Sequence, residues 1–265
     1  MQNLTVKDVF RLRKAIASVQ SDSFFPHFRR LLRGRLRFDT FLMMRFDGGL
    51  PPTLLGTWKR RNTLPPHVLG DYFEGAYRLD PFYQFRAVPP EGGVYRMSDI
   101  APDRFYASEY FQQYFKQTGL RDEVGFLAPL PSGGMANLSF SRLAQGGPYR
   151  RRELQCLQHF SPILLELLTT HCAGFQPPDM PEDNQRPTQA LDQSILREVN
   201  QSLPARLTRR EAQIAALVLQ GHSNASAAVM MAISRETVKV HRRNLYAKLD
   251  ISSPGELFTM LRHLL

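Results

Sequence analysis

Features that mark several large protein classes are missing from this sequence or scarce in it. Its 265 residues include two cysteines and one tryptophan. Cys156 and Cys172 lie 16 residues apart in a stretch with helical periodicity. On a continuous helix they would be about 24 Å apart, far beyond the reach of a disulfide. We therefore expect two free thiols and a reducing compartment.

Long apolar runs are also missing. No stretch approaches the roughly 18 consecutive apolar residues of a membrane span. The chain starts with MQNLTVKDVFRLRKAIASV, an amphipathic and charged stretch without the apolar middle of a signal peptide. These absences predict a soluble, cytoplasmic protein with no membrane partner.

Signatures of catalysis are equally scarce. The sequence has no spacing typical of metal ligands, no nucleophile elbow and no glycine-rich phosphate loop. Its seven histidines are scattered along the chain. We expect no enzymatic activity, no metal site and no cofactor.

Positive charge is the component present in excess. The chain has 34 Lys and Arg against 24 Asp and Glu, a formal net charge of +10. This charge favours an anionic partner, either nucleic acid or a membrane surface. A hydrophobic content of 43% is enough to bury a core in one or two domains.

One stretch divides the chain. Gly174–Gln189, GFQPPDMPEDNQRPTQ, holds four prolines and no sustained apolar periodicity, and proline disfavours helix at its own position and at the one before. We place a first domain at residues 1–173, a linker with a connecting helix at 174–203, and a second domain at 204–265.

Helical and extended patterns alternate before the linker. The helices are expected at Thr5–Val19, Ser21–Leu36, Pro66–Ala76, Asp103–Gln117 and Arg151–His171. The strands are expected at Phe38–Phe46, Thr53–Arg60, Gly93–Ile100, Glu123–Leu130 and Asn137–Leu143. This pattern predicts an α/β sandwich with a central, mostly antiparallel sheet flanked by helices.

The second domain is expected to contain four helices. Thr208 and Glu211 form a capping-box pattern that starts the first helix, and Gly221 is placed to end it. A short second helix, Asn224–Met231, ends in a turn after which Ser234 can cap a third. The fourth is expected to begin with Ser253 as its cap and Pro254 at its first helical position.

The third helix lies in ISRETVKVHRRNLYAKL, Ile233–Leu249, which carries five positive charges. At about 100° per residue, a narrow arc facing the core is formed by Val238, Leu245 and Leu249. A separate cationic face is formed by Arg235, Lys239, Arg242, Arg243 and Tyr246, with Val240 at its margin. A solvated face is one interpretation. A helix held by a tight turn across a short preceding helix also fits the major groove of DNA.

The segments LTRREAQIAALVLQGHSN, AISRETVKVHRRNLYAKLDI and SSPGELF resemble the GerE-type helix-turn-helix domain of LuxR-type transcription regulators, over about Leu207–Leu265. The resemblance implies a homodimer on a two-fold-related operator in double-stranded DNA. It also implies dimerisation through the fourth helix and allows RNA polymerase as a further partner.

The same resemblance assigns residues to the DNA interface. The implied base-reading positions are Lys239, Val240 and Arg243. The implied phosphate contacts are Thr237, Arg235, Arg242 and Lys248. Asn224, at the start of the second helix, is expected to fix that helix against the DNA backbone, to cap it, or to do both.

The second helix departs from the family pattern. Ala227, Val229 and Met230 in NASAAVMMAIS replace a larger aliphatic residue and one or two charged residues. Two interpretations stay open: local repacking, or an apolar contact patch for the N-terminal domain or a partner protein.

LuxR-type regulators differ in the domain that precedes this one. A receiver domain would need an Asp near position 55, where the chain reads GGLPPTLLGTW, and an ATPase would need a phosphate loop. The remaining type is a small-molecule-sensing, GAF/PAS-like domain. GDYFEGAYRLDPFYQF resembles the segment of acyl-homoserine-lactone receptors in which an aromatic residue precedes an Asp-Pro pair.

This second resemblance places a pocket around Tyr72–Tyr83. Asp80 would accept a hydrogen bond from the ligand, with Trp58, Tyr72 and Tyr95 among the walls. His67 stands where the receptors have their first pocket Trp, which is a departure from the family. Asp80 is equally well placed to cap a helix, and the local tyrosines can equally well form a core.

Two functions therefore stay open. In the first, the chain is a sequence-specific DNA-binding regulator that senses a small molecule, in the manner of quorum-sensing receptors. In the alternative, it is a LuxR-type regulator without a ligand, whose first domain serves dimerisation or protein–protein contact. A ligand-dependent shift in thermal melting distinguishes them, because a molecule that binds only the folded state stabilises it.

Overall fold

The computed structural model describes residues 5–48, 50–60, 68–86, 91–175 and 190–265. They form two compact units. The first comprises Met1–Leu64, Phe85–Ile100 and Gly119–Arg186, and the second comprises Pro65–Gln84, Ala101–Thr118 and Pro187–Leu265. Two segments from the first 173 residues thus belong to the same unit as the C-terminal helices. The domain boundaries at 173 and 203 stay a prediction, and the linker from residue 176 to 189 lies outside the described residues.

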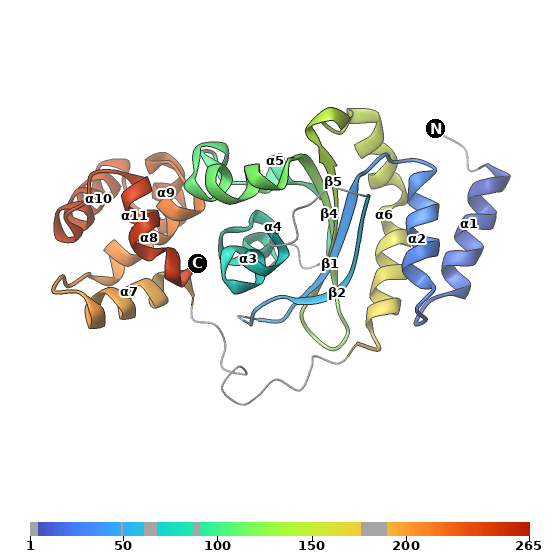
Figure 1. The fold of residues 1–265 in the computed structure, drawn as a ribbon, viewed down its shortest axis with the longest axis horizontal. Coiled ribbons are helices and arrows are strands. Elements are labelled where there is room, and N and C mark those ends of the chain that lie inside the picture. Colours follow the sequence, from blue (N-terminus) through green and yellow to red (C-terminus); the bar gives the residue numbers. More distant parts are fainter. Residues whose placement is uncertain (1–4, 49, 61–67, 87–90, 176–189) are drawn as a thin grey trace. The chain divides into compact units, whose positions relative to one another are not determined.

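A five-stranded antiparallel sheet forms the centre of the first unit (Figure 1). Its strands are β1 (Thr40–Phe46), β2 (Thr53–Lys59), β3 (Gly93–Arg96), β4 (Leu120–Pro129) and β5 (Met135–Leu143). The strand order is β2-β1-β5-β4-β3, and every pairing is antiparallel. The predicted antiparallel sheet is confirmed.

One predicted strand is too long. Residues Gly93–Ile100 were expected to be extended, but Met97–Ile100 form a helical turn, α5. The pairing of β3 with β4 ends at Arg96 opposite Val124. The sequence SDI that follows Met97 contains two residues that are not typical of strands, which favours leaving the ladder there.

Three helices lie on one face of this sheet (Figure 1). They are α1 (Val6–Ala17), α2 (Phe24–Arg33) and α6 (Arg151–Cys172). Their apolar side chains and the alternate residues of β1, β4 and β5 form one core, which includes Phe24, Phe28, Met43, Phe126, Phe140 and Leu168. Both cysteines lie on α6 as free thiols. None of the helices in the described part of the chain is long and apolar enough to cross a membrane.

The second unit is helical. Its N-terminal elements are α3 (Val68–Glu74), η1 (Ala76–Leu79), α4 (Pro81–Phe85, whose last residue belongs to the first unit), η2 (Phe105–Ala107), η3 (Tyr110–Tyr114) and η4 (Phe115–Thr118). Its C-terminal elements are α7 (Leu191–Ser202), α8 (Arg209–Gln220), α9 (Asn224–Met231), α10 (Arg235–Leu249), α11 (Pro254–Leu261) and η6 (Arg262–Leu264). The four helices predicted for the second domain, α8 to α11, are present.

The single helix predicted over Asp103–Gln117 is wrong. The segment consists of a 3₁₀ turn, a π turn and a second 3₁₀ turn. Ser108 lies at the first break, where its hydroxyl donates to the Phe105 carbonyl at 2.7 Å and accepts from the Phe111 N–H at 3.2 Å. Such local side-chain bonds compete with the regular helical ladder.

Candidate functional site

Helix α10 presents two different faces. Ser234 caps it by accepting the Thr237 N–H at 3.0 Å. Val238, Leu245 and Leu249 are buried, as the helical wheel predicts. The exposed residues of the helix's first half and middle include the predicted DNA contacts Arg235, Thr237, Lys239, Val240 and Arg243, together with Glu236 and Asn244. Val240 is 44% exposed among these cationic residues, and an apolar side chain in this setting suits contact with a thymine methyl group.

The cations of this face are weakly held. Lys239 pairs with Glu236 at 2.8 Å, but their side chains are 47% and 76% exposed, and exposed pairs contribute little to stability. Within the part of the chain that the structure describes, Arg235 and Arg243 have no ion pair. Lys239 and Arg243 can therefore reorient toward DNA without leaving a buried charge behind.

Arg242 is held inside the domain. Its guanidinium donates to Asn224 Oδ1 at 3.1 Å and to the Tyr246 hydroxyl at 3.1 Å, and it lies over the Tyr246 ring. The cap of α9 is Ser223, which accepts the Ser226 N–H at 3.2 Å. The interpretation of Asn224 as the cap is therefore wrong. Its side chain instead connects the start of α9 to α10.

Lys248, predicted to contact a phosphate, forms an ion pair with Glu211 at 2.8 Å. Glu211 is buried and also accepts the Thr208 N–H in the predicted capping box. Burial alone would raise the pKa of Glu211, but the hydrogen bonds from Lys248 and Thr208 outweigh it and hold the pKa below its ordinary value. Glu211 is therefore an anion at neutral pH, and a DNA phosphate must compete with it for Lys248.

The apolar surface predicted on α9 contains two residues, not three. Val229 is 81% exposed and Met230 is 65% exposed. Ala227 is buried, so the small residue at this position belongs to the core.

Asp80 lies at the start of α4 and is buried. One carboxylate oxygen accepts the Phe82 N–H at 2.9 Å, and the other accepts the Tyr72 hydroxyl at 2.6 Å. Burial raises the pKa of Asp80 to about 6, against the lowering effect of these two bonds. The structure therefore joins the predicted ligand residues Tyr72 and Asp80, and it shows that Asp80 also caps a helix.

Trp58 belongs to a different cluster. On β2 it is paired directly with Phe41 of β1, and residues directly opposite in an antiparallel ladder share a face. Its ring stacks on Phe41 at 6.4 Å, and the guanidinium of Arg29 on α2 lies 4.5 Å above it. Trp58 thus packs against the core that α2 covers, and its role as a wall of the Asp80 pocket stays a prediction.

Tyr95, the fourth predicted ligand residue, lies on β3. Its ring contacts Phe85 edge-to-face at 4.9 Å, and its hydroxyl donates to the Gly92 carbonyl at 3.3 Å. Burial raises the pKa of this hydroxyl.

Asn137 is a candidate that the sequence did not reveal. It lies on β5 and is 0% exposed, and neither atom of its amide group has a hydrogen-bond partner among the described residues. It alternates with Leu138 and Phe140 of the core beneath the helices, so it points to the opposite face of the sheet. Ser139 and Ser141 share that face and are also buried. Alternating polar residues normally predict that this side of a strand faces solvent. The burial of these polar residues could therefore not be recognised in the sequence.

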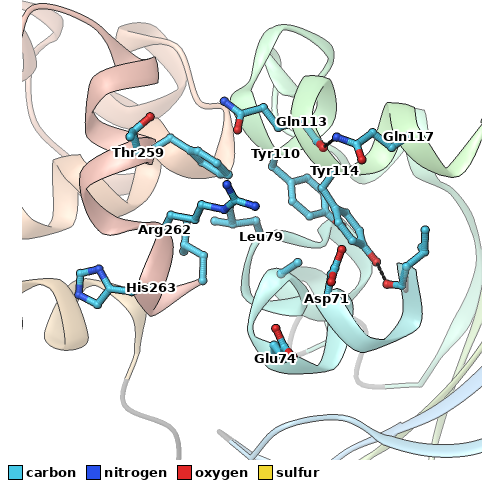
Figure 2. A pocket seen from close by; sticks show the side chains of 14 residues that line it. Asp71, Glu74, Leu79, Tyr110, Gln113, Tyr114, Gln117, Thr259, Arg262 and His263 are labelled. Atoms are coloured by element: carbon cyan, nitrogen blue, oxygen red, sulfur yellow. Dashed lines mark hydrogen bonds between the residues drawn. The ribbon is translucent and has the colours of Figure 1, made fainter. Parts of the chain in front are cut away.

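A groove of about 680 Å³ lies in the second unit (Figure 2). It is lined by α3, η1 and η3 on one side and by α11, η6 and the C-terminal residue on the other. Arg262 projects into it from the C-terminal side, and Asp71 lies below Tyr110 on the other (Figure 2). Tyr110 and Tyr114 stack at 5.4 Å. None of the four predicted ligand residues is among its lining residues.

The turn between α8 and α9 is bound by residues from the first-domain sequence. The Ser223 N–H donates to Asp103 Oδ1 at 2.9 Å, and the Arg104 N–H donates to the Gly221 carbonyl at 2.9 Å. Gly221 has φ +94°, and a Cβ there would lie 2.9 Å from the Cα of Phe105. Only glycine fits both the left-handed conformation and this close approach.

Comparison with known proteins agrees with this geometry. Residues 205–261 match the family described as GerE, bacterial regulatory proteins, luxR family. The chain is 32% identical over 187 residues to a protein of Aeromonas salmonicida described as an HTH-type transcriptional regulator in the exeN 3′ region, and the match covers 70% of this chain and 95% of that one. It is 41% identical over 58 residues to the response regulator protein TmoT of Ectopseudomonas mendocina, covering 22% of this chain and 26% of that one.

The fold also has a counterpart among solved structures. The VqsR LBD domain from Pseudomonas aeruginosa superposes with a TM-score of 0.53 and 21% identity, covering 62% of this chain and 93% of that one. The predicted fold class, an antiparallel sheet with flanking helices followed by a helical helix-turn-helix domain, is confirmed.

Proposed function

The chain belongs to the LuxR family of bacterial transcriptional regulators, and we propose that it binds its operator as a homodimer under the control of a small-molecule effector. Helix α10 lies in the major groove in this proposal. Lys239, Val240 and Arg243 contact base edges. The phosphates are contacted by Arg235 and Thr237 at the start of the helix, and by Lys248 after its release from Glu211.

The exposed half of α10 carries the DNA-binding proposal. Its cations have no buried partner, whereas Arg242 and Asn224 are bonded to each other at 3.1 Å. We therefore assign Arg242 and Asn224 to holding α10 against α9. We assign the direct contacts to the exposed cations. Removing a positioning pair should weaken binding to all DNA sequences alike, while removing a base contact should change the sequence that the protein prefers.

The effector proposal is supported by the unpaired amide of Asn137. A buried amide without a hydrogen-bond partner is costly, and a bound molecule with polar groups would satisfy it. The similarity of fold to the VqsR LBD domain supports the same proposal. The roles of Tyr72, Asp80 and Tyr95 stay predictions from the sequence resemblance. The effector we infer is amphipathic, with a hydrogen-bonding head and an apolar body.

One observation favours the ligand-free alternative. Both oxygens of Asp80 are already bonded within the chain, to Tyr72 and to the Phe82 N–H. A carboxylate satisfied in this way can serve the fold alone. In that case the N-terminal domain serves dimerisation or contact with another protein.

A pair of measurements tests the proposal. Operator selection from random DNA should return a two-fold-related site that binds at least about a thousandfold more tightly than random sequence. Melting the full-length protein with a panel of acyl-homoserine lactones and fatty acylamides should identify a compound that raises Tm, and Asn137→Leu should abolish that shift without lowering the Tm of the free protein. Equal affinity for selected and random DNA contradicts the DNA assignment, and an Asn137→Leu variant with an unchanged ligand shift contradicts the role of Asn137.

A further inference from the structure

Helix α1 exposes an unusual amount of apolar surface. Ten large hydrophobic side chains are exposed in the described residues, and four of them lie on this one helix. They are Val6 at 73%, Val9 at 53%, Phe10 at 58% and Ile16 at 52%. Monomeric proteins rarely leave a contiguous apolar patch in water unless a partner covers it.

These four residues form one stripe. At about 100° per residue they fall within an arc of about 120°, together with Arg13 and Ala17. The opposite side of the helix is fixed to its own fold, because the buried Asp8 pairs with Arg35 at 2.6 Å. The stripe therefore points away from the core of its own chain.

We propose that this stripe, defined as Val6, Val9, Phe10, Arg13, Ile16 and Ala17, joins two copies of the chain with their α1 helices antiparallel. The inference rests on the homodimer in the proposed function and names its surface. The two copies would be related by a two-fold axis at the middle of α1, between residues 11 and 12.

The stripe is complementary to itself in this arrangement. The axis sets Phe10 of one copy opposite Arg13 of the other, and the symmetry repeats the contact. A guanidinium over a phenyl ring is a favourable cation–π pair. Val6 is then opposite Ala17, whose small side chain allows the two helix ends to approach.

The apolar surface continues beyond α1. Leu12 borders the stripe on the helical wheel and lines a shallow furrow with Phe160 and Ile163 of α6. Ile163 is itself 39% exposed. A standard interface buries roughly 800 Å² per partner. One helix of 12 residues, about 18 Å long, does not supply this area alone, so the second area enlarges the contact.

The rival occupant is an anionic membrane surface, because α1 also carries Lys7, Arg11 and Lys14. A basic amphipathic helix binds such surfaces by laying its apolar face between the headgroups. A second copy of the chain is the favoured occupant because Arg13 lies inside the apolar arc. A stripe that faces lipid would have an apolar residue at this position, whereas Phe10 of a second copy gives Arg13 a partner.

Sedimentation velocity of the full-length protein tests the inference. The wild type should be a dimer, and Phe10→Lys should weaken it by about tenfold or more because the new Lys faces Arg13 of the other copy. The double variant Phe10→Lys/Arg13→Glu should restore the dimer, since each Lys then faces a Glu. Met230→Lys, at an exposed apolar residue of α9, is the matched control and should leave the dimer unchanged. Far-UV circular dichroism checks that each variant is folded.

Several outcomes would overturn the inference. They are a monomeric wild type, a dimer insensitive to Phe10→Lys, a double variant that fails to recover, and a wild type that floats with vesicles of phosphatidylcholine and phosphatidylglycerol while remaining monomeric in solution. Operator binding is measured separately. A monomer that still selects its operator contradicts the α1 contact alone, and a dimer through α1 that does not select DNA contradicts the regulator proposal.

Discussion

The backbone N–H of Ser223 donates a hydrogen bond of 2.9 Å to the carboxylate of Asp103. Ser223 is the cap of α9, and α9 supports α10 through Asn224 and Arg242. A residue of the first-domain sequence is thus bonded to α9, the helix that positions α10. We expect this contact to couple the two parts of the chain.

Removing the Asp103 carboxylate tests that coupling. Asp103→Ala should speed hydrogen exchange at the Ser223 amide and lower the free energy of unfolding by about 1 kcal/mol, the usual value of one hydrogen bond. Burial raises the pKa of Asp103, but the hydrogen bonds with Ser223 outweigh it and lower the pKa overall. The stabilisation should therefore be present at neutral pH and be lost as the pH falls through the lowered folded-state value. Asp99→Ala, at an exposed residue of α5, is the control, and unchanged exchange at Ser223 would contradict the coupling.

The proposed base contacts of α10 make a second prediction. Lys239→Ala and Arg243→Ala should each cost about 1–3 kcal/mol in operator affinity and relax the sequence preference at one base pair. Lys116→Ala removes an equal charge from an exposed position on η4 and serves as the control. Fluorescence anisotropy with the operator and with single-base variants gives both quantities. A uniform loss across all sequences would reassign these residues to phosphate contact.

The Glu211–Lys248 pair makes a third prediction. Glu211→Gln keeps the capping box, because glutamine also accepts the Thr208 N–H, and it releases Lys248. The free energy of unfolding should fall by about 1 kcal/mol at pH 7. DNA affinity should rise, and its dependence on salt should steepen by about one counterion. Chemical denaturation and anisotropy at several salt concentrations measure these effects. Weaker DNA binding by Glu211→Gln would show that Lys248 acts on DNA only through the helix packing.

The buried Asp80 makes a fourth prediction. Its folded-state pKa is raised to about 6 from an ordinary value of 3.8, so between these values the folded protein holds more protons than the unfolded chain. Stability should fall as pH rises from about 4 to 6, by up to about 3 kcal/mol, and stay level above that. Asp80→Asn keeps a capping oxygen and should remove this dependence.

Tyr72→Phe is the variant to compare with Asp80→Asn. It leaves the carboxyl group in place but removes a hydrogen bond that favours the charged form, so the pH dependence should become larger. Thermal melts between pH 4 and pH 8 compare the three proteins. If the Tm of the wild type and the Tm of Asp80→Asn change in parallel with pH, another group causes the pH dependence of stability.

The sequence by itself determined the C-terminal helices. Thr208, Ser234 and Ser253 cap three of them as predicted, and Gly221 ends the first in a left-handed conformation. The division of α10 into a buried and a cationic face also followed from its periodicity. Caps and periodicity act between residues three or four apart, so they can be recognised in a linear sequence.

Only the tertiary structure decided which polar groups are buried and which residues meet. Asn137 and Ser139 look solvent-facing in sequence, but both are buried. Trp58 joins the aromatic core under α2 because its register with Phe41 fixes its face. Lys248 meets Glu211 across 37 positions of sequence. These outcomes depend on strand register and helix packing, which bring distant residues together through the folding of the whole chain and leave no pattern in either local segment.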